Sequence, residues 1–151
     1  MVGLALGIGV VTFDHAEGLS YFSTDPASCV NCHIMQPQYD AWQKGPHHAA
    51  ATCAGCHLPV EFPDLYLEKA RNGWNHSAAF TLGGFPEPIV ITPSNARTLQ
   101  DNCVRCHDSM THAISEAVGP PTCVDCHADA GHGPRAGLGG PWDPTESQDR
   151  P

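Results

Sequence analysis

The apolar positions of the chain form one uncharged run at the N-terminus and one stretch of helical periodicity further along. Residues 1–13 carry no charge, and acidic residues follow them directly. A helix that spans a bilayer takes about 20 apolar residues, so this run is long enough only if its helix continues to Phe22. Residues 62–74 space their apolar side chains along one face, with Lys69 and Arg71 on a polar side. The pattern predicts a helix in each place.

The N-terminal run has three interpretations. A secretory signal peptide would carry a basic start and a small-residue cleavage site, and residues 1–22 have neither. A helix buried in a protein core is compatible with the length. The third interpretation is a membrane anchor whose cytoplasmic start is missing from this chain, with Tyr21 and Phe22 at the level of the lipid headgroups. We favour the third and expect residues 1–22 to form an abbreviated transmembrane helix.

The rest of the chain has few long periodic runs. The whole chain contains 14 prolines and 15 glycines, which favours loops and short helices. We therefore expect a mainly α fold with much irregular loop and almost no β structure. Its parts are the anchor helix at 1–22, one domain at 23–132 and an irregular C-terminal tail at 133–151.

The cysteines change this picture, because all eight fall in C-x-x-C pairs and a histidine directly follows each pair. The motifs are C-V-N-C-H at 29–33, C-A-G-C-H at 53–57, C-V-R-C-H at 103–107 and C-V-D-C-H at 123–127. This pattern attaches haem c through two thioether bonds, with the histidine as proximal ligand. Paired cysteines also bind zinc or form disulfides, but neither use requires a histidine after every pair. We predict four covalently bound haems, attached through Cys29, Cys32, Cys53, Cys56, Cys103, Cys106, Cys123 and Cys126.

Four haems would also supply the apolar interior that such a chain lacks. Burial of porphyrin surface offsets the entropy lost when an irregular chain becomes ordered, so a haem-cored cytochrome domain fits the composition. The motifs begin at residues 29, 53, 103 and 123, so the first two and the last two are natural pairs. The net charge of −9 argues against a nucleic-acid partner. No phosphate loop, nucleotide fingerprint or Ser-His-Asp arrangement supports another enzyme class.

The axial ligands are chosen from more histidines than the haems require. A six-coordinate haem takes a second axial ligand, which is commonly histidine. The motifs predict His57, His107 and His127 as proximal ligands, and in the first motif Met35 follows His33 by two residues. The other histidines are His15, His47, His48, His76, His112 and His132.

Several segments carry a family resemblance. They are the apolar N-terminal run followed by A-E-G-L-S-Y-F-S-T-D-P, C-V-N-C-H-I-M, Q-Y-D-A-W-Q-K-G-P-H-H, K-A-R-N-G-W-N-H-S-A-A-F-T, and E-P-I-V-I-T-P before the third motif. Together they resemble the NapC/NirT-type membrane tetrahaem quinol dehydrogenases, and the resemblance covers about residues 10–132. Within that family they are most similar to the small subunits that feed a pentahaem cytochrome c nitrite reductase.

The resemblance implies a function at the cytoplasmic membrane. The chain would oxidise a menaquinol-like quinol and pass electrons through four haems, on the periplasmic face, to a periplasmic multihaem reductase of the nitrite reductase type. A homo-oligomer within that complex is also compatible with the resemblance. The alternatives are a soluble periplasmic electron shuttle without a quinol site and a terminal reductase that acts at an open iron.

The resemblance also implies individual ligands. His132 would be the distal ligand of the second haem and His48 that of the third, with His47 as the alternative to His48. Met35 would take the axial position at the first haem in place of His33. A methionine ligand generally raises the haem potential relative to two histidines.

The fourth haem and the quinol site are less defined by the sequence. The family's distal ligand to the fourth haem is a lysine from the partner, and His112 or His76 could fill that place instead. For the quinol site, the family places a lysine and a second polar residue on the helix that begins near residue 62. Our candidates are Lys69, Asn72 and His76, with Asp40 in second place and a solvated helix face as the alternative for each.

Overall fold

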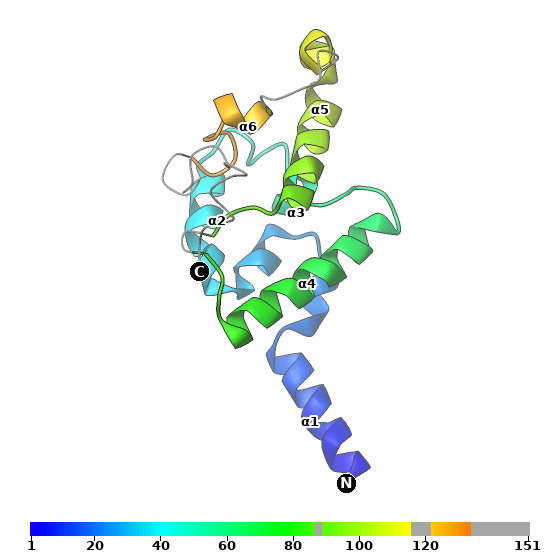
Figure 1. Cartoon of the computed structure of the whole chain (residues 1–151). Helices are drawn as coiled ribbons and strands as arrows, with labels where there is room; N and C mark the ends of the chain where they lie inside the picture. The colour runs from blue at the N-terminus through cyan, green and yellow to red at the C-terminus, as the bar shows by residue number, and fades with distance from the viewer. Residues whose placement is uncertain (87–88, 116–121, 134–151) are drawn as a thin grey trace.

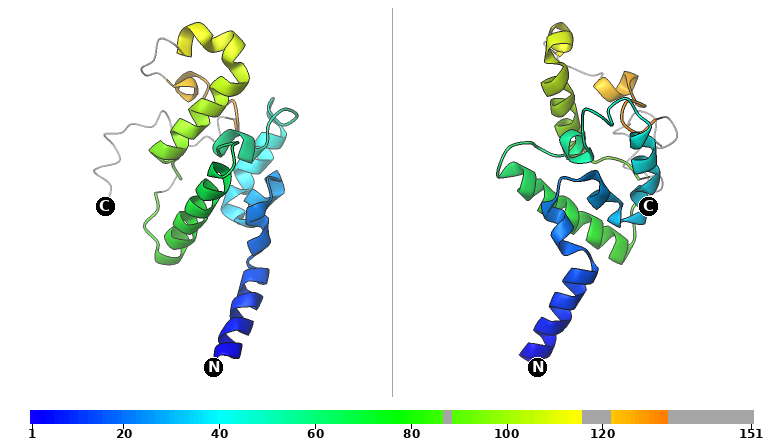
Figure 2. Two further views of the ribbon diagram at one scale, coloured as in Figure 1. Left: turned by 90° about the vertical axis from the view of Figure 1, so that its right-hand side faces the viewer. Right: turned by 180° about the vertical axis from the view of Figure 1, so that it is seen from behind.

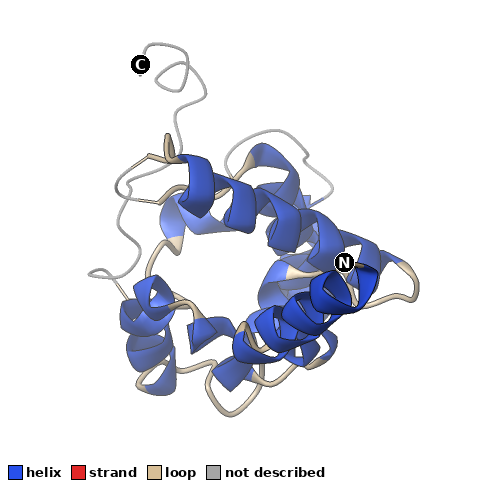
Figure 3. Cartoon of the chain, turned by 90° about the horizontal axis from the view of Figure 1, so that it is seen from below, coloured by secondary structure: helices blue, strands red, loops and turns tan. Residues whose placement is uncertain are grey.

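The architecture is that of a computed structural model, which describes residues 1–86, 89–115 and 122–133. Its elements are α1 (Val2–His15), η1 (Gly18–Phe22), η2 (Pro26–Asn31), η3 (His33–Met35), α2 (Gln36–Gln43), α3 (Cys53–His57), α4 (Asp64–Leu82), α5 (Pro93–Ser115) and α6 (Cys123–Cys126), where η denotes a 3-10 helix. Within the described ranges there is no strand (Figure 3), which confirms the mainly α prediction. The predicted tail lies outside these ranges except for Gly133.

Helix α1 projects from the rest of the molecule and carries the N-terminus at its free end (Figures 1 and 2). Its large apolar side chains are all exposed, from 51% for Phe13 to 75% for Val2. Among the described residues, no helix combines the length and the apolar character needed to cross a membrane.

The predicted continuation of the first helix to Phe22 is wrong. Helix α1 ends at His15, and Glu17 takes a left-handed backbone conformation with φ 52°. A single residue in that conformation ends an α-helix, because the next peptide units turn away from its axis. The chain continues as the short η1, and Phe13 packs directly over Gly18. Apolar pattern alone did not reveal this break.

The segment that contains η1 packs against α4, the helix predicted from the periodicity of residues 62–74. The structure confirms that helix and extends it to Leu82. Gly73 is buried at the contact, where an added Cβ would lie 2.6 Å from Cε1 of Tyr21. Phe22 lies near Tyr66, with ring centroids 6.3 Å apart. The absence of a side chain at Gly73 therefore allows an aromatic ring to lie directly on the helix.

The second and third cysteine motifs lie side by side, although they are the most distant neighbours in sequence. Asn102 on α5 is 8% exposed and donates from Nδ2 to the carbonyls of Cys56 and Leu58, each at 2.9 Å. Arg105 donates to the carbonyl of Gly55 at 3.4 Å. These bonds join α3 to α5, so the pairing suggested by sequence spacing is incomplete: motif two also pairs with motif three.

The described part of the protein contains no large side chain that is fully buried. The helices instead surround a central region, as the view from below shows (Figure 3). A chain that folds around its own core buries several Leu, Ile, Val or Phe side chains completely. The interior of this fold therefore depends on something other than packed side chains.

Candidate haem and quinol sites

Helical turns present the paired cysteines. The second and fourth pairs lie on the short helices α3 and α6, whereas the third lies inside the long helix α5. In α3, the side chain of Thr52 accepts a hydrogen bond from the backbone N–H of Gly55 at 3.1 Å. In α6, Thr122 and Asp125 form a reciprocal capping box. Such caps stabilise a helical turn that is too short to be stable by itself. All eight cysteines lie in the described residues, and none of them forms a disulfide.

The first three motifs are neighbours in order. A hydrogen bond with Cys53 is the main cause that lowers the pKa of the Cys29 thiol to about 7, so the first motif touches the second. Burial raises the pKa of Cys56, and the nearby thiol of Cys106 raises it further. The second motif therefore lies beside the third.

The fourth motif continues the series. Burial raises the pKa of Cys103, and the next cause is the charge of the Cys123 thiolate nearby. The backbone N–H of Cys123 donates to the side-chain carbonyl of Gln100 on α5 at 2.9 Å. The four motifs thus form one continuous row in which each touches the next. Groups attached there would be close enough to exchange electrons in sequence.

Two histidines predicted as ligands of the second haem face each other. The ring centroids of His57 and His132 are 5.7 Å apart, and the ring planes are within 3° of parallel. Imidazole nitrogens bind metals at about 2 Å and lie roughly 1 Å from the ring centre, so two rings on opposite sides of one metal have centres about 6 Å apart. Burial lowers the pKa of His57 to about 4, with His132 as the second cause. The neutral imidazole favoured in this way is the form that binds metals.

The histidine pair before the second motif is divided between two roles. The ring of His47 faces that of His107, with centroids 6.1 Å apart. Nδ1 of His47 donates to the carbonyl of Ala130 at 2.9 Å, which leaves Nε2 free to bind a metal. His48 instead packs against Trp42, with ring centroids 4.8 Å apart. The family resemblance implies His48 as the distal ligand with His47 as its alternative, and of the two it is His47 whose ring faces His107.

Substitution of these adjacent histidines should separate their roles. We expect His47→Ala to convert one haem from six- to five-coordinate, because a distal imidazole is lost. His48→Ala, the matched control, should leave ligation unchanged, because its ring packs on Trp42. Electron paramagnetic resonance of the oxidised protein would detect a new high-spin signal. If that signal arises only in His48→Ala, the assignment from ring geometry is wrong.

The remaining predicted ligands lie as follows. His33 and Met35 are the two ends of η3, and His33 is exposed whereas Met35 is half-buried. His127 follows α6 and is exposed. Burial lowers the pKa of His76 on α4. His112 lies in α5, but its side chain is outside the described part of the chain.

The residues present fit haem c. Each motif offers two thiols on one turn with a histidine directly after them, and two of the motif histidines face a second imidazole at the separation expected across a metal. The interior lacks fully buried large side chains in the described ranges. A large apolar group at each motif would supply that missing core.

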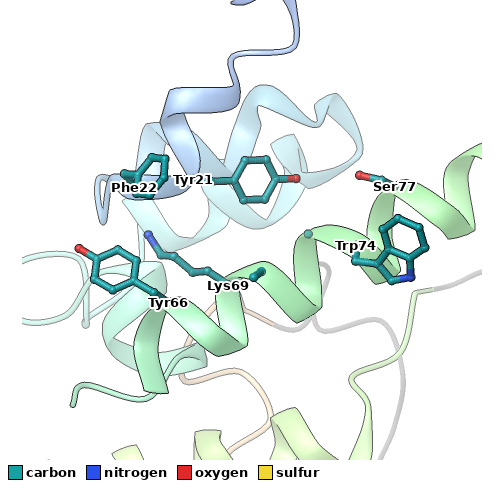
Figure 4. A pocket seen from close by; sticks show the side chains of 8 residues that line it. Tyr21, Phe22, Tyr66, Lys69, Trp74 and Ser77 are labelled. Atoms are coloured by element: carbon teal, nitrogen blue, oxygen red, sulfur yellow. The ribbon is translucent and has the colours of Figure 1, made fainter. Parts of the chain in front are cut away.

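A pocket of about 380 Å³ lies where η1 meets α4 (Figure 4). Its lining residues are Tyr21, Phe22, Tyr66, Lys69, Ala70, Gly73, Trp74 and Ser77. The Nζ of Lys69 donates to the carbonyl of Ser23 and lies 5.9 Å from the centroid of the Tyr66 ring. Burial lowers the pKa of Lys69, and the thiolate of Cys29 opposes that shift. Because the charge of Cys29 acts on Lys69, the lysine lies close to the first haem motif.

Of the predicted quinol-site residues, only Lys69 lines this pocket. The side-chain carbonyl of Asn72 accepts from Nδ2 of Asn95 on α5 at 3.2 Å, so Asn72 joins two helices. Asp40 accepts from Gln36 at 2.8 Å within α2. His76 is not among the lining residues.

The sequence prediction missed the aromatic and hydroxyl side chains of the pocket. The missed residues are Tyr21, Tyr66, Trp74 and Ser77. The sequence did contain a signal for Tyr66 and Ser77, because residues 66, 70, 73 and 77 recur at helical spacing on one face of α4. The contribution of Tyr21 comes from a different element and could not be read from this spacing.

Comparison with known proteins identifies the family to which the chain belongs. Residues 1–87 match the N-terminal region of the NapC/NirT cytochrome c family. The cytochrome c-type protein NrfH of Wolinella succinogenes is 39% identical over 143 residues, which cover 86% of this chain and 81% of that protein. The chain belongs to the NapC/NirT cytochrome c family. The predicted family and the haem c cofactor are thereby confirmed.

Two further comparisons extend the likeness. The cytochrome c-type protein TorC of Escherichia coli K12 is 26% identical over 159 residues, covering 87% of this chain and 40% of TorC. In a crystal structure of the cytochrome c nitrite reductase NrfHA complex bound to the HQNO inhibitor, one chain is 23% identical with a TM-score of 0.67. That match covers 94% of this chain and 99% of the other, and it shows that the two share a fold.

Proposed function

We propose that the chain is a membrane-attached tetrahaem quinol dehydrogenase that delivers electrons to a periplasmic multihaem reductase. The observation that carries the proposal is the pocket between η1 and α4, which contains a half-buried lysine beside the first haem motif. A quinol needs an apolar mouth for its ring, a polar group for its hydroxyl and an electron acceptor within reach. The pocket combines these three requirements.

Aromatic walls and one cation define what the pocket can bind. Phe22, Tyr66 and Trp74 offer ring surfaces for a flat apolar ligand. Oxidation of a quinol releases two electrons and two protons, so the protein must accept protons as well as electrons. Lys69 is the proposed proton acceptor, because it lines the pocket and burial lowers the pKa of its ammonium. The proton that Lys69 accepts passes on to water at the open side of the pocket.

Electron delivery rests on the row of motifs. When bound, the four haems supply one-electron carriers between the quinol and the partner. The chain's own residues hold that row together through Asn102, Arg105 and Gln100, which bridge one motif to the next. The fourth motif lies at the end of the row away from the first motif, so this end of the row is the proposed exit.

Membrane attachment is supported by the surface around the pocket. The large side chains of α1 are apolar and exposed, and Leu19 and Phe22 of η1 are 71% and 66% exposed. Exposed apolar patches of this kind mark membrane or protein contacts. We propose that α1 and η1 hold the pocket at the membrane, with the haem domain on the periplasmic face. The partner is a multihaem reductase of the nitrite reductase type, by analogy with the complex of similar fold.

Anaerobic reduction by a menaquinol analogue tests this function. The detergent-solubilised protein with all haems attached should show rapid growth of the reduced haem bands, and HQNO should abolish it. Reduction by a soluble dye donor serves as the control for intact haems. Normal reduction by the dye with no reduction by the quinol would leave a soluble-type electron shuttle as the function.

A further inference from the structure

Tyr21 occupies a position that only a glycine on α4 allows. An added Cβ at Gly73 would lie 2.6 Å from Cε1 and 3.2 Å from Cζ of the Tyr21 ring. Real Cβ atoms do not approach so closely, so any side chain at residue 73 would displace the ring. The phenol of Tyr21 thus lies over α4, between the Lys69 end of the pocket and Ser77.

The hydroxyls of Tyr21 and Ser77 point toward one another from two different elements. Figure 4 shows the Tyr21 hydroxyl directed along α4 to Ser77, whose hydroxyl is directed back. The ammonium of Lys69 lies at the opposite end of the Tyr21 ring in the same view. In the described part of the protein, neither hydroxyl makes a hydrogen bond with another group. Two hydroxyl groups can therefore form hydrogen bonds with a ligand at the end of the pocket away from Lys69.

A quinol has two hydroxyls at opposite ends of one ring, and the proposed function assigns only one of them. We propose that Tyr21 and Ser77 form a second quinol-positioning site, which holds the hydroxyl that Lys69 does not reach. This inference rests on the proposed quinol site and extends it to both ends of the ligand. Each hydroxyl of the pair can donate or accept, so the site suits the quinol hydroxyl and the carbonyl formed from it. When the quinol is oxidised, the O–H bond at this end breaks as well: its proton passes to water, because Tyr21 and Ser77 are both exposed, and its electrons leave through the ring to the first haem motif.

Removal of either hydroxyl should weaken quinol binding without affecting the haems. We expect Tyr21→Phe and Ser77→Ala each to raise KM for the quinol about 3- to 10-fold, which corresponds to one hydrogen bond. The kcat and the reduced haem spectrum should stay unchanged. Both groups would bind the same quinol hydroxyl. The rise in KM of the double variant should therefore be smaller than the product of the rises in the two single variants.

Thr81→Ala is the matched control, since it removes another hydroxyl of α4. The Thr81 hydroxyl donates to the carbonyl of Ser77 at 2.7 Å and does not line the pocket. Its KM should equal that of the wild type. Gly73→Ala retains both hydroxyls but displaces the Tyr21 ring, so it should raise KM at least as much as Tyr21→Phe. Titration with HQNO gives a binding readout for the pocket that is independent of turnover.

The outcomes separate this inference from the proposed function. If the wild type oxidises quinol and Tyr21→Phe, Ser77→Ala and Gly73→Ala all keep its KM, the positioning site is wrong and the quinol dehydrogenase stands. If the wild type is reduced by dye but not by quinol, both proposals fall. A rise of KM in the three pocket variants, with Thr81→Ala unchanged, supports the site.

Discussion

The chain made without haem is expected to lack a cooperative unfolding transition. In the described residues no large side chain is fully buried. A domain of this length gains its stability from buried apolar surface that outweighs the loss of chain entropy. With the porphyrins absent, the remaining contacts are short helices, caps and a few buried bonds such as those of Asn102. We therefore expect an expanded ensemble with some helix and no fixed tertiary structure.

Circular dichroism during heating would measure this effect. The same sequence, expressed in cells that cannot attach haem, should lose ellipticity gradually, whereas the haem-loaded protein should unfold over a narrow temperature range. A thiol reductant must be present, because eight free cysteines could otherwise form disulfides. A sharp transition in the haem-free chain would show that the protein folds around its own side chains.

The parts of this fold that the sequence predicted are those set by local chemistry. Haem attachment needs two thiols and a histidine on one turn, so the four motifs are complete within five residues each. The order of the motifs in space depends on bonds such as Asn102 to Cys56, which join distant segments. Spacing therefore suggested two pairs of motifs, whereas the structure shows one row.

Neighbouring residues with the same chemistry were also beyond the reach of the sequence. The sequence does not distinguish His47 from His48 as a ligand, whereas in the structure the ring of His47 lies near His107 and that of His48 packs on Trp42. The end of α1 is a similar case. A left-handed residue at a helix end is usually glycine, yet here Glu17 adopts that conformation and Gly18 follows it. Contact between Phe13 and Gly18 accompanies this turn.

Replacement of Lys69 is expected to slow quinol oxidation strongly. Positioned acid–base groups typically contribute 100-fold or more to a rate, so Lys69→Met should slow reduction by quinol about 100-fold. Reduction by a soluble dye should proceed as in the wild type. Arg71→Ala is the matched control, because Arg71 lies on the same helix but pairs with Glu68 and bonds to Ser94 outside the pocket.

A structural role for Lys69 predicts a different result, and one further variant distinguishes the two. The Nζ of Lys69 donates to the carbonyl of Ser23, so the lysine could act only by holding that segment in place. Lys69→Arg keeps a donor and a positive charge but cannot lose a proton at ordinary pH. If Lys69 accepts a proton, this variant should remain slow. Its rate should also lose the increase with pH that comes from neutral lysine, because burial lowers the pKa of Lys69 and its neutral form grows as pH rises. If Lys69→Arg instead restores the wild-type rate and pH profile, the lysine positions Ser23 and another group takes the proton.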